Sequence, residues 1–197
     1  MIRGSREIRD AYRLDAVAQA YVAERFRQPL GAVLHRRQVE AVLRVIRAVQ
    51  PERVLEIAPG PARLTVDVVR AFRGQLIMVD SSMQMLGEAR KRLGIPLRCR
   101  PAQADAFALP FRSEFDMVYS FRLIRHFDLA ERAALYRQIA HVLRPNGLFV
   151  FDAVNRTVSE PLRARAAPGE YQHFDALLRP EQLEQDSGPH DEDHLLG

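Results

Sequence analysis

Three acidic residues are spaced so that each can lie at the end of a different β-strand. Glu56, Asp80 and Asp105 are separated by 24 and 25 residues, about the length of one strand, one helix and their loops. A carboxylate at Asp80 can accept two hydrogen bonds from the vicinal hydroxyls of a ribose, or can cap the following helix. Asp105 can accept from an adenine amino group, or be an ordinary solvated turn residue. Together the three acids favour a nucleoside-binding site.

A turn of small residues follows the first predicted strand. It consists of Ala58, Pro59, Gly60, Pro61 and Ala62. Such a strand-to-helix turn lets backbone N–H groups approach the charged end of a ligand. Gly60 is the position where the lack of a side chain matters most, although a plain tight connection fits the same residues.

These residues need a scaffold of alternating strands and helices. Apolar and β-branched runs predict strands over residues 53–57, 75–79, 96–100, 115–120 and 148–154. Helices are predicted from the turn to about residue 72, from a cap at Ser81 or Ser82 to residue 93, and over residues 129–143. The last helix has its apolar face at Leu129, Ala133, Tyr136, Ile139, Ala140 and Leu143. This alternation predicts an α/β fold with a doubly wound, mostly parallel sheet, which binds ligands outside the carboxyl ends of its strands.

The chain divides into four predicted regions. Residues 1–50 form a helical cap, with one helix over 10–27, an interruption at 29–31 and a second helix that ends at Val49. The cofactor-binding core, the substrate-side segment and a disordered acidic tail follow over residues 51–155, 156–186 and 187–197. Beyond the core the periodicity fades, with one short helix near residues 179–184 and disorder expected from Asp186 onward.

The composition excludes several classes of protein. The 197 residues are 47% hydrophobic and 27% charged, which suits one folded domain. No uncharged run reaches ten residues, so no membrane-spanning helix is expected, and the first residues lack a secretory signal. The single cysteine, Cys99, excludes an internal disulfide and a cysteine-based zinc site, and no other metal site is predicted. A cytoplasmic location is therefore expected.

The charge is unevenly distributed. Residues 181–197 carry six acids and no Lys or Arg, which leaves 29 Lys and Arg residues against 19 acids in residues 1–180. Lys91 is the only lysine. An arginine-rich surface suits anionic ligands, or reflects codon usage. Because the arginines are spread over every predicted element instead of one stripe, nucleic-acid binding is not expected.

Four segments resemble, in order, the motifs of one enzyme family. They are VLEIAPGPARLT (residues 54–65), MVDSSMQML (78–86), ADAFALPF (104–111), and FDMVYS followed by LRPNGL (115–120 and 143–148). The set resembles Rossmann-like (class I) S-adenosylmethionine-dependent methyltransferases, especially the small-molecule branch that includes ubiquinone/menaquinone-biosynthesis methyltransferases. Residues 15–21 are similar to the N-terminal segment of that branch, so the resemblance covers about residues 10–160.

The resemblance implies S-adenosylmethionine as the cofactor and assigns residues to its parts. The implied contacts are Tyr21, Glu56, Ala58, Pro59, Gly60, Ala62, Asp80, Ser81, Met83, Asp105, Ala106, Phe107, Ser120 and Phe121. In that order they would hold the methionine part, the ribose, the adenine and the region of the sulfonium methyl.

Two departures from the family pattern concern backbone conformation. Ala58 and Ala62 stand where the family usually has glycine; alanine adopts negative φ readily, so cofactor binding is expected to survive. Asn146 replaces the first glycine of the usual Pro-Gly-Gly turn, and asparagine tolerates a left-handed conformation.

The acceptor side has fewer signals. His126 is the general-base candidate by residue type, or else a histidine that makes hydrogen bonds near the start of the next helix. Arg122 and Arg125 can hold an anionic acceptor, or be solvated surface residues. Tyr171 and His173 fall where the resembled family often closes over its substrate.

The predicted function is methyl transfer to a small-molecule acceptor, aromatic or quinone-like. The alternatives are a non-catalytic binding or scaffold protein that keeps the fold, and a truncated methyltransferase. A nicotinamide-dependent oxidoreductase is disfavoured because the turn lacks the Gly-x-Gly-x-x-Gly pattern.

An open edge of the sheet is also predicted. The family's sheet normally continues with an antiparallel strand pair, and residues 156–197 show no such pair. Exposed strand edges pair with other chains, so a homodimer is expected. Alternatively, residues 156–186 fold back and cover the edge.

Overall fold

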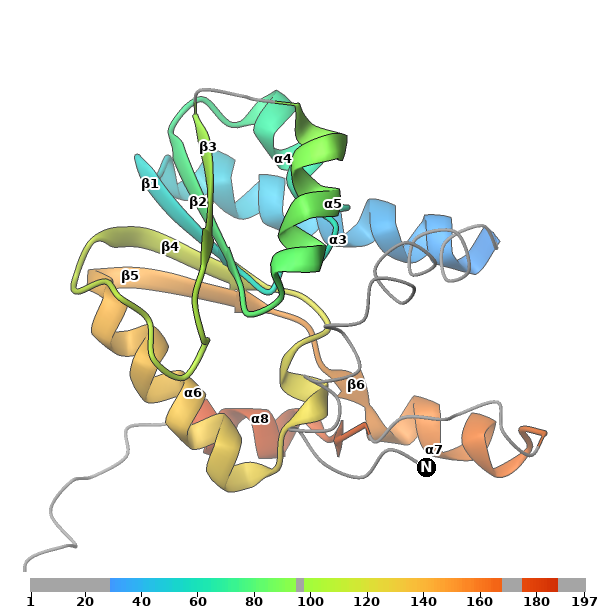
Figure 1. The fold of residues 1–197 in the computed structure, drawn as a ribbon. Helices are drawn as coiled ribbons and strands as arrows, with labels where there is room; N and C mark the ends of the chain where they lie inside the picture. Colours follow the sequence, from blue (N-terminus) through green and yellow to red (C-terminus); the bar gives the residue numbers. More distant parts are fainter. Residues whose placement is uncertain (1–28, 95–97, 168–174, 188–197) are drawn as a thin grey trace, which may run out of the picture.

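The fold is built on a five-stranded sheet. The computed structural model describes residues 29–94, 98–167 and 175–187. The strands, in the order β3-β2-β1-β4-β5 across the sheet (Figure 1), are β1 Arg53–Ile57, β2 Gln75–Asp80, β3 Cys99–Gln103, β4 Phe115–Ser120 and β5 Leu143–Phe151. Every neighbouring pair is parallel, so all the strands end at one edge. The predicted doubly wound α/β fold is confirmed.

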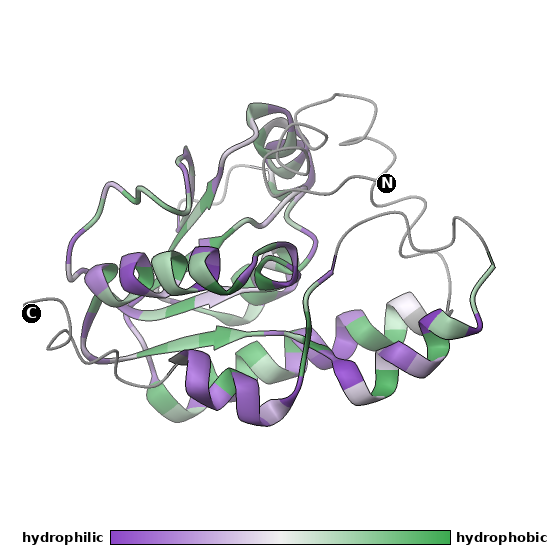
Figure 2. Cartoon of the chain, turned by 90° about the horizontal axis from the view of Figure 1, so that it is seen from below, coloured by the Kyte–Doolittle hydropathy of each residue, from purple (hydrophilic) through white to green (hydrophobic). Residues whose placement is uncertain are grey.

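Helices cover both faces of the sheet (Figure 1). One face carries α3 Pro29–Val49, α4 Thr65–Ala71 and α5 Met83–Leu93; the other carries α6 Leu129–Val142 and α8 Pro180–Ser187. Because side chains alternate along a strand, Val54 packs into the core under α3, α4 and α5, whereas Leu55 packs into the core under α6. Figure 2 shows helices striped with hydrophobic and hydrophilic residues, as two-sided packing requires.

Helix α3 begins at Pro29, so the predicted interruption at residues 29–31 is wrong. Proline is well suited to the first position of a helix, because its missing N–H would have no partner there. The predicted helix over 10–27 lies outside the described residues. Neither α3, the longest of the described helices, nor any other helix in those ranges is long and apolar enough to cross a membrane.

Two local predictions are displaced. The third strand runs over Cys99–Gln103 instead of 96–100. It contains Pro101, which an edge strand tolerates because one side of its backbone has no strand to pair with. The second strand, Gln75–Asp80, agrees closely with the predicted range 75–79. Of the two serines predicted as caps, Ser82 and not Ser81 caps α5, since its hydroxyl accepts the N–H of Met85.

The buried face of α6 differs from the predicted apolar face. The buried residues are Arg132, Leu135, Ile139 and Val142. Leu129 is 60% exposed, and Ala140 is also exposed. The apolar pattern misplaced the face because an arginine occupies one of the buried positions. Strand β5 is irregular at its start, where Asn146 has φ 64°, so the predicted left-handed conformation is confirmed.

The C-terminal segment folds against α6 and the loop after β4. Strands β6 Val154–Asn155 and β7 Leu177–Leu178 form a separate parallel pair, with helix α7 Arg156–Ala164 between them in sequence. The sequence patterns did not predict α7. Asp186, expected to be disordered, is buried in α8, whereas residues 188–197 lie outside the described ranges. Within those ranges β5 pairs only with β4, and no antiparallel pair extends the sheet.

Candidate functional site

The turn after β1 holds three residues in the left-handed region. Ala58, Gly60 and Ala62 have φ values of 55°, 56° and 57°. The expected negative φ for the two alanines is therefore wrong. A left-handed alanine costs roughly 1–2 kcal/mol relative to its usual conformation. The Ala58 N–H donates to Val79 O at 2.8 Å, which fixes the turn against β2.

Asp80 ties this turn to the start of α5. Its Oδ2 accepts the N–H of Gly60 at 3.0 Å, and its Oδ1 accepts the N–H of Ser82 at 2.9 Å. Burial raises the pKa of Asp80, although the N–H groups of Ser82 and Gly60 oppose the rise. Because Ser82 caps α5, the carboxylate of Asp80 is placed at the strand ends instead of acting as the cap.

Two hollows share Ala58 as a lining residue. The first, here called the β2 hollow, is lined by Ile57, Ala58, Val79, Asp80, Ser81, Ala104, Asp105, Ala106, Phe107, Leu123 and Phe127. The second, here called the turn hollow, is lined by Glu56, Ala58, Pro59, Gly60, Pro61, Arg63, Leu64, Phe121 and Arg122. A Cβ added to Gly60 would meet no atom within 4 Å, so space remains beside the turn.

The β2 hollow combines one buried acid with an apolar wall. The rings of Phe107 and Phe127 meet edge to face at 5.0 Å between centroids. The carboxylate of Asp105 accepts the N–H of Phe107 at 3.0 Å and is exposed, which suits a group that shapes the loop as well as one that meets a ligand. Met83 does not line either hollow and is 45% exposed.

The turn hollow has a buried carboxyl at its base. Glu56 Oε2 accepts the hydroxyl of Thr65 at 2.7 Å and that of Tyr119 at 2.8 Å. Burial raises the pKa of Glu56 to about 7, and the two hydroxyl bonds and the charge of Arg63 limit the rise. The Ser120 hydroxyl donates to Ile57 O at 2.8 Å, so it joins β4 to β1 and does not line a hollow.

A chain of polar contacts from α3 closes one wall of the turn hollow. Gln38, 4% exposed, accepts a hydrogen bond from Arg63 and donates one to Asp152. Asp152 also accepts the N–H of Arg122, whose φ is 64°. The sequence patterns assigned no role to Gln38, Arg63 or Asp152. A signal did exist, since Gln38 falls four residues before Val42 in the buried stripe of α3.

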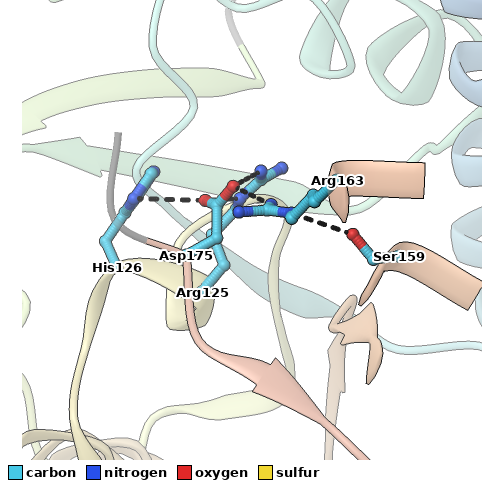
Figure 3. Close-up of polar contacts among 5 residues, drawn as sticks. All are labelled: Arg125, His126, Ser159, Arg163 and Asp175. Atoms are coloured by element: carbon cyan, nitrogen blue, oxygen red, sulfur yellow. Dashed lines mark hydrogen bonds and ion pairs between the residues drawn. The ribbon is translucent and has the colours of Figure 1, made fainter. Parts of the chain in front are cut away.

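The loop after β4 is held by an ion-pair cluster (Figure 3). In η1, the short helix Ile124–His126, Arg125 makes a two-pronged pair with Asp175, and Arg163 of α7 reaches the same carboxylate. Burial alone would raise the pKa of Asp175, but the bonds and charges of the two arginines lower it. His126 Nδ1 lies 3.9 Å from Asp175 Oδ1, and the side chain is 11% exposed.

The structure therefore brings most of the predicted cofactor residues together, and the predicted acceptor residues less so. Arg122 lines the turn hollow, whereas Arg125 and His126 line neither hollow. Tyr21, Tyr171 and His173 lie outside the described residues. The roles of all these side chains stay predictions.

Comparison with known proteins gives consistent matches. Residues 54–147 match the family described as "Methyltransferase domain". The chain is 27% identical over 133 residues to a malonyl-[acyl-carrier protein] O-methyltransferase of Legionella pneumophila, a match that covers 66% of this chain and 46% of the relative. It is 30% identical over 120 residues to a ubiquinone biosynthesis O-methyltransferase of Parvibaculum lavamentivorans, a match that covers 58% of this chain and 45% of the relative. The chain thus spans about half the length of these curated relatives.

A similar fold occurs among solved structures. Magnesium protoporphyrin IX methyltransferase from Synechocystis, solved with bound SAH, aligns with a TM-score of 0.73 and 14% identity. The alignment covers 91% of this chain and 85% of that one. At this identity the likeness concerns the fold.

Proposed function

Since the chain carries a class I S-adenosylmethionine-dependent methyltransferase domain, we propose that it binds S-adenosylmethionine across the two hollows and transfers the methyl group to a small-molecule acceptor. The observation that carries the proposal is the position of Asp80, whose carboxylate lies between the β2 hollow and the N–H of Gly60 in the turn hollow. A carboxylate at this strand end has the chemistry to accept ribose hydroxyls.

The residues present fit the cofactor. The apolar wall formed by Leu123, Phe107 and Phe127 suits an adenine, with Asp105 and the Ala106 backbone at its edge. The turn hollow, which adjoins it at Ala58, suits the methionine part. When bound, S-adenosylmethionine supplies a methyl group activated by its sulfonium.

The protein's own contribution to such a displacement is position and the exclusion of water. We propose that Phe121 and Arg122, at the end of β4, form the wall that the acceptor meets. An acceptor hydroxyl would also need to lose a proton, and His126 is the proposed base. Its Nδ1 lies 3.9 Å from Asp175 Oδ1, an ion-pair distance that keeps the imidazole beside the cluster without a hydrogen bond to it. Because Arg125 is paired with Asp175, it contributes to this loop's structure.

The acceptor proposed is an aromatic or quinone-like small molecule. The support is the likeness to the ubiquinone biosynthesis O-methyltransferase, together with an aromatic side chain, Phe121, at the turn hollow. We also propose that the protein acts in the cytoplasm. We propose further that it forms a homodimer, because the edge of β5 away from β4 is unpaired within the described residues. Light scattering during size exclusion tests the dimer, which a 22.5 kDa monomer across micromolar concentrations would rule out.

The test of the cofactor site is calorimetric titration of Asp80→Ala with S-adenosylmethionine. Loss of two hydrogen bonds to a charged group is expected to weaken binding about 100-fold or more. Asp116→Ala is the matched control: Asp116 also accepts two backbone N–H groups, from Glu52 at 2.9 Å and Arg53 at 2.8 Å. It lies at the opposite end of the strands, so its loss should affect stability and leave the affinity unchanged. Unchanged affinity in Asp80→Ala would refute the site.

Methyl transfer itself needs a separate measurement. Turnover with quinone-like phenols, followed by mass spectrometry, would support the enzyme. Tight cofactor binding without transfer to any acceptor would favour the non-catalytic alternative.

A further inference from the structure

Helix α7 of the C-terminal segment borders a groove that is separate from the β2 hollow and the turn hollow. The groove, here called the α7 groove, has a volume of about 340 Å³. It is lined by Arg156, Thr157, Glu160, Pro161 and Ala164 of α7 and by Arg179, which lies between β7 and α8. Cavities that bind small molecules generally measure about 300–1,000 Å³. The α7 groove is therefore large enough for a small ligand.

The side chains of α7 divide into stripes, because residues four positions apart share a face of a helix. One stripe faces the ion-pair cluster around Asp175 (Figure 3), where Arg163 donates to both Ser159 and Asp175. Another stripe lines the α7 groove and consists of Arg156, Glu160 and Ala164. The contacts of Arg163 with the cluster thus attach α7 to the fold without using the side chains that line the groove.

The one ion pair inside the α7 groove is long and solvated. Arg156 Nε and Nη2 each lie 3.4 Å from a carboxylate oxygen of Glu160, and the two side chains are 42% and 59% exposed. Exposed pairs of this kind contribute little to stability, because water and salt screen them. Arg156 can therefore exchange the carboxylate of Glu160 for a ligand at small cost.

Arg179 faces the α7 groove from a fixed position. Its N–H donates to Gln182 Oε1 at 2.9 Å, and its carbonyl accepts the N–H groups of Gln182 and Leu183, which holds its main chain at the start of α8. Within the part of the chain that the structure describes, the guanidinium of Arg179 has no hydrogen bond or ion pair. Its charge is thus uncompensated by a neighbouring acid.

The α7 groove combines this positive charge with an apolar surface. Two arginines against one glutamate give it a net charge of +1. A guanidinium presents paired N–H donors that match the oxygens of a phosphate group, and a phosphate has enough oxygens to meet two guanidinium groups. Pro161 and Ala164 supply the apolar part of the lining. This chemistry suits an anionic group that is carried on an apolar body.

We propose that the α7 groove binds a phosphate monoester whose organic part is apolar. Arg156 and Arg179 hold the phosphate, and Pro161 and Ala164 contact the organic part. Because the α7 groove shares no lining residue with the β2 hollow or the turn hollow, this inference does not depend on the binding of S-adenosylmethionine. The ligand would also bridge α7 to the start of α8.

The test is calorimetric titration with 1-naphthyl phosphate and with its two parts, 1-naphthol and inorganic phosphate. The ester is expected to bind at least about 10-fold more tightly than either part, because only the ester meets both the arginines and the apolar surface. Saturating S-adenosylmethionine should leave this affinity unchanged. No binding of the ester, an affinity equal to that of 1-naphthol, or competition with S-adenosylmethionine would overturn the inference.

A first pair of variants tests the arginines. Arg179→Met is expected to weaken the binding of 1-naphthyl phosphate about 10-fold and to leave that of 1-naphthol within about 2-fold. The matched control is Arg165→Met, because Arg165 directly follows α7, is exposed and does not line the groove. It removes the same charge and should bind the ester as the unsubstituted protein does. Equal losses in the two variants would show attraction by net charge alone and overturn the site.

A second pair predicts an effect of opposite sign. Glu160→Gln removes the carboxylate that competes with the phosphate for Arg156, so 1-naphthyl phosphate should bind about 3-fold more tightly. Glu181→Gln is the control, since Glu181 is an exposed acid of α8 that does not line the groove. It should leave the affinity unchanged. The absence of a gain in Glu160→Gln, or an equal gain in both variants, would contradict the placement of the phosphate at Arg156.

Discussion

The turn after β1 and the loop after β4 meet the same edge of the sheet, but different kinds of bond hold them. The turn is held mainly by backbone N–H groups that donate to Asp80 and Val79 of the adjacent strand. The loop is held by ion pairs to the C-terminal segment, such as that of Arg125 with Asp175, 50 residues away. Changes of charge are therefore expected to act most strongly on the loop, and changes of backbone conformation on the turn.

The largest expected effect is on the loop side, at the buried pair of Arg132 and Asp186. Arg132 Nη2 lies 2.8 Å from Asp186 Oδ2, and the two side chains are 6% and 9% exposed. In Asp186→Ala the arginine keeps its charge without this partner, so the free energy of unfolding should fall by about 3–5 kcal/mol. Urea denaturation measures it.

The double variant Arg132→Met, Asp186→Ala is the control for that prediction. It should recover most of the loss, because no buried charge remains. Failure of the double variant to recover would mean that α8 contributes packing and not charge pairing.

A pH effect is expected on the turn side, at Glu56. Its pKa in the folded protein is raised from 4.5 to about 7, so the folded state binds the proton more tightly than the unfolded state does. Stability from this group is fully present below pH 4.5 and is lost as the pH rises to about 7, a difference of about 3 kcal/mol. Glu56→Gln should lack this loss, and denaturation at pH 5 and pH 8 measures the difference between the two proteins. Parallel pH profiles would contradict the assignment.

His126→Ala separates catalysis from binding on the loop side. If His126 takes the acceptor proton, turnover of His126→Ala should fall by about 100-fold while the affinity for S-adenosylmethionine is kept. Steady-state kinetics beside calorimetry measures both. Near-full activity would instead favour a histidine that only supports the loop through Asp175.

The smallest expected effect is a gain in stability at Ala58. Glycine adopts φ 55° without the steric cost that alanine pays, so Ala58→Gly should raise the free energy of unfolding by about 1 kcal/mol. Ala62→Gly should gain less, because the Ala62 methyl is fully buried and its removal loses packing. A loss of stability in Ala58→Gly would show that the packing of the Ala58 methyl group stabilises the fold by more than its left-handed backbone costs.

The contrast between turn and loop also explains what could be predicted from the sequence. The strand ends at Glu56, Asp80 and Ser120 were placed correctly because apolar runs and strand–helix spacing are local signals. The positive φ of Ala58 was not predicted correctly, because hydrogen bonds to other segments impose this turn and the identity of an alanine does not indicate them. The face of α6 was misplaced at Arg132, whose burial depends on a residue 54 positions later.

The polar contacts of α3 fall between these cases. Gln38 stands out as a polar residue on a buried stripe, but its partners Arg63 and Asp152 lie 25 and 114 residues away. Periodicity can mark such a residue as unusual. It does not indicate which groups will form hydrogen bonds with that residue.

The separation of 54 residues between Arg132 and Asp186 has a consequence for synthesis of the chain. At about 5–20 residues per second, a ribosome adds Asp186 roughly 3 to 11 seconds after Arg132. During that interval α6 carries an arginine among the residues that will be buried, and water must solvate it until α8 arrives. The pairing of β1 with β2 and β4, and the hydrogen bonds of Asp80 to the turn, involve no residue of α8. The turn can therefore form on the nascent chain before the loop after β4 is fastened to the C-terminal segment.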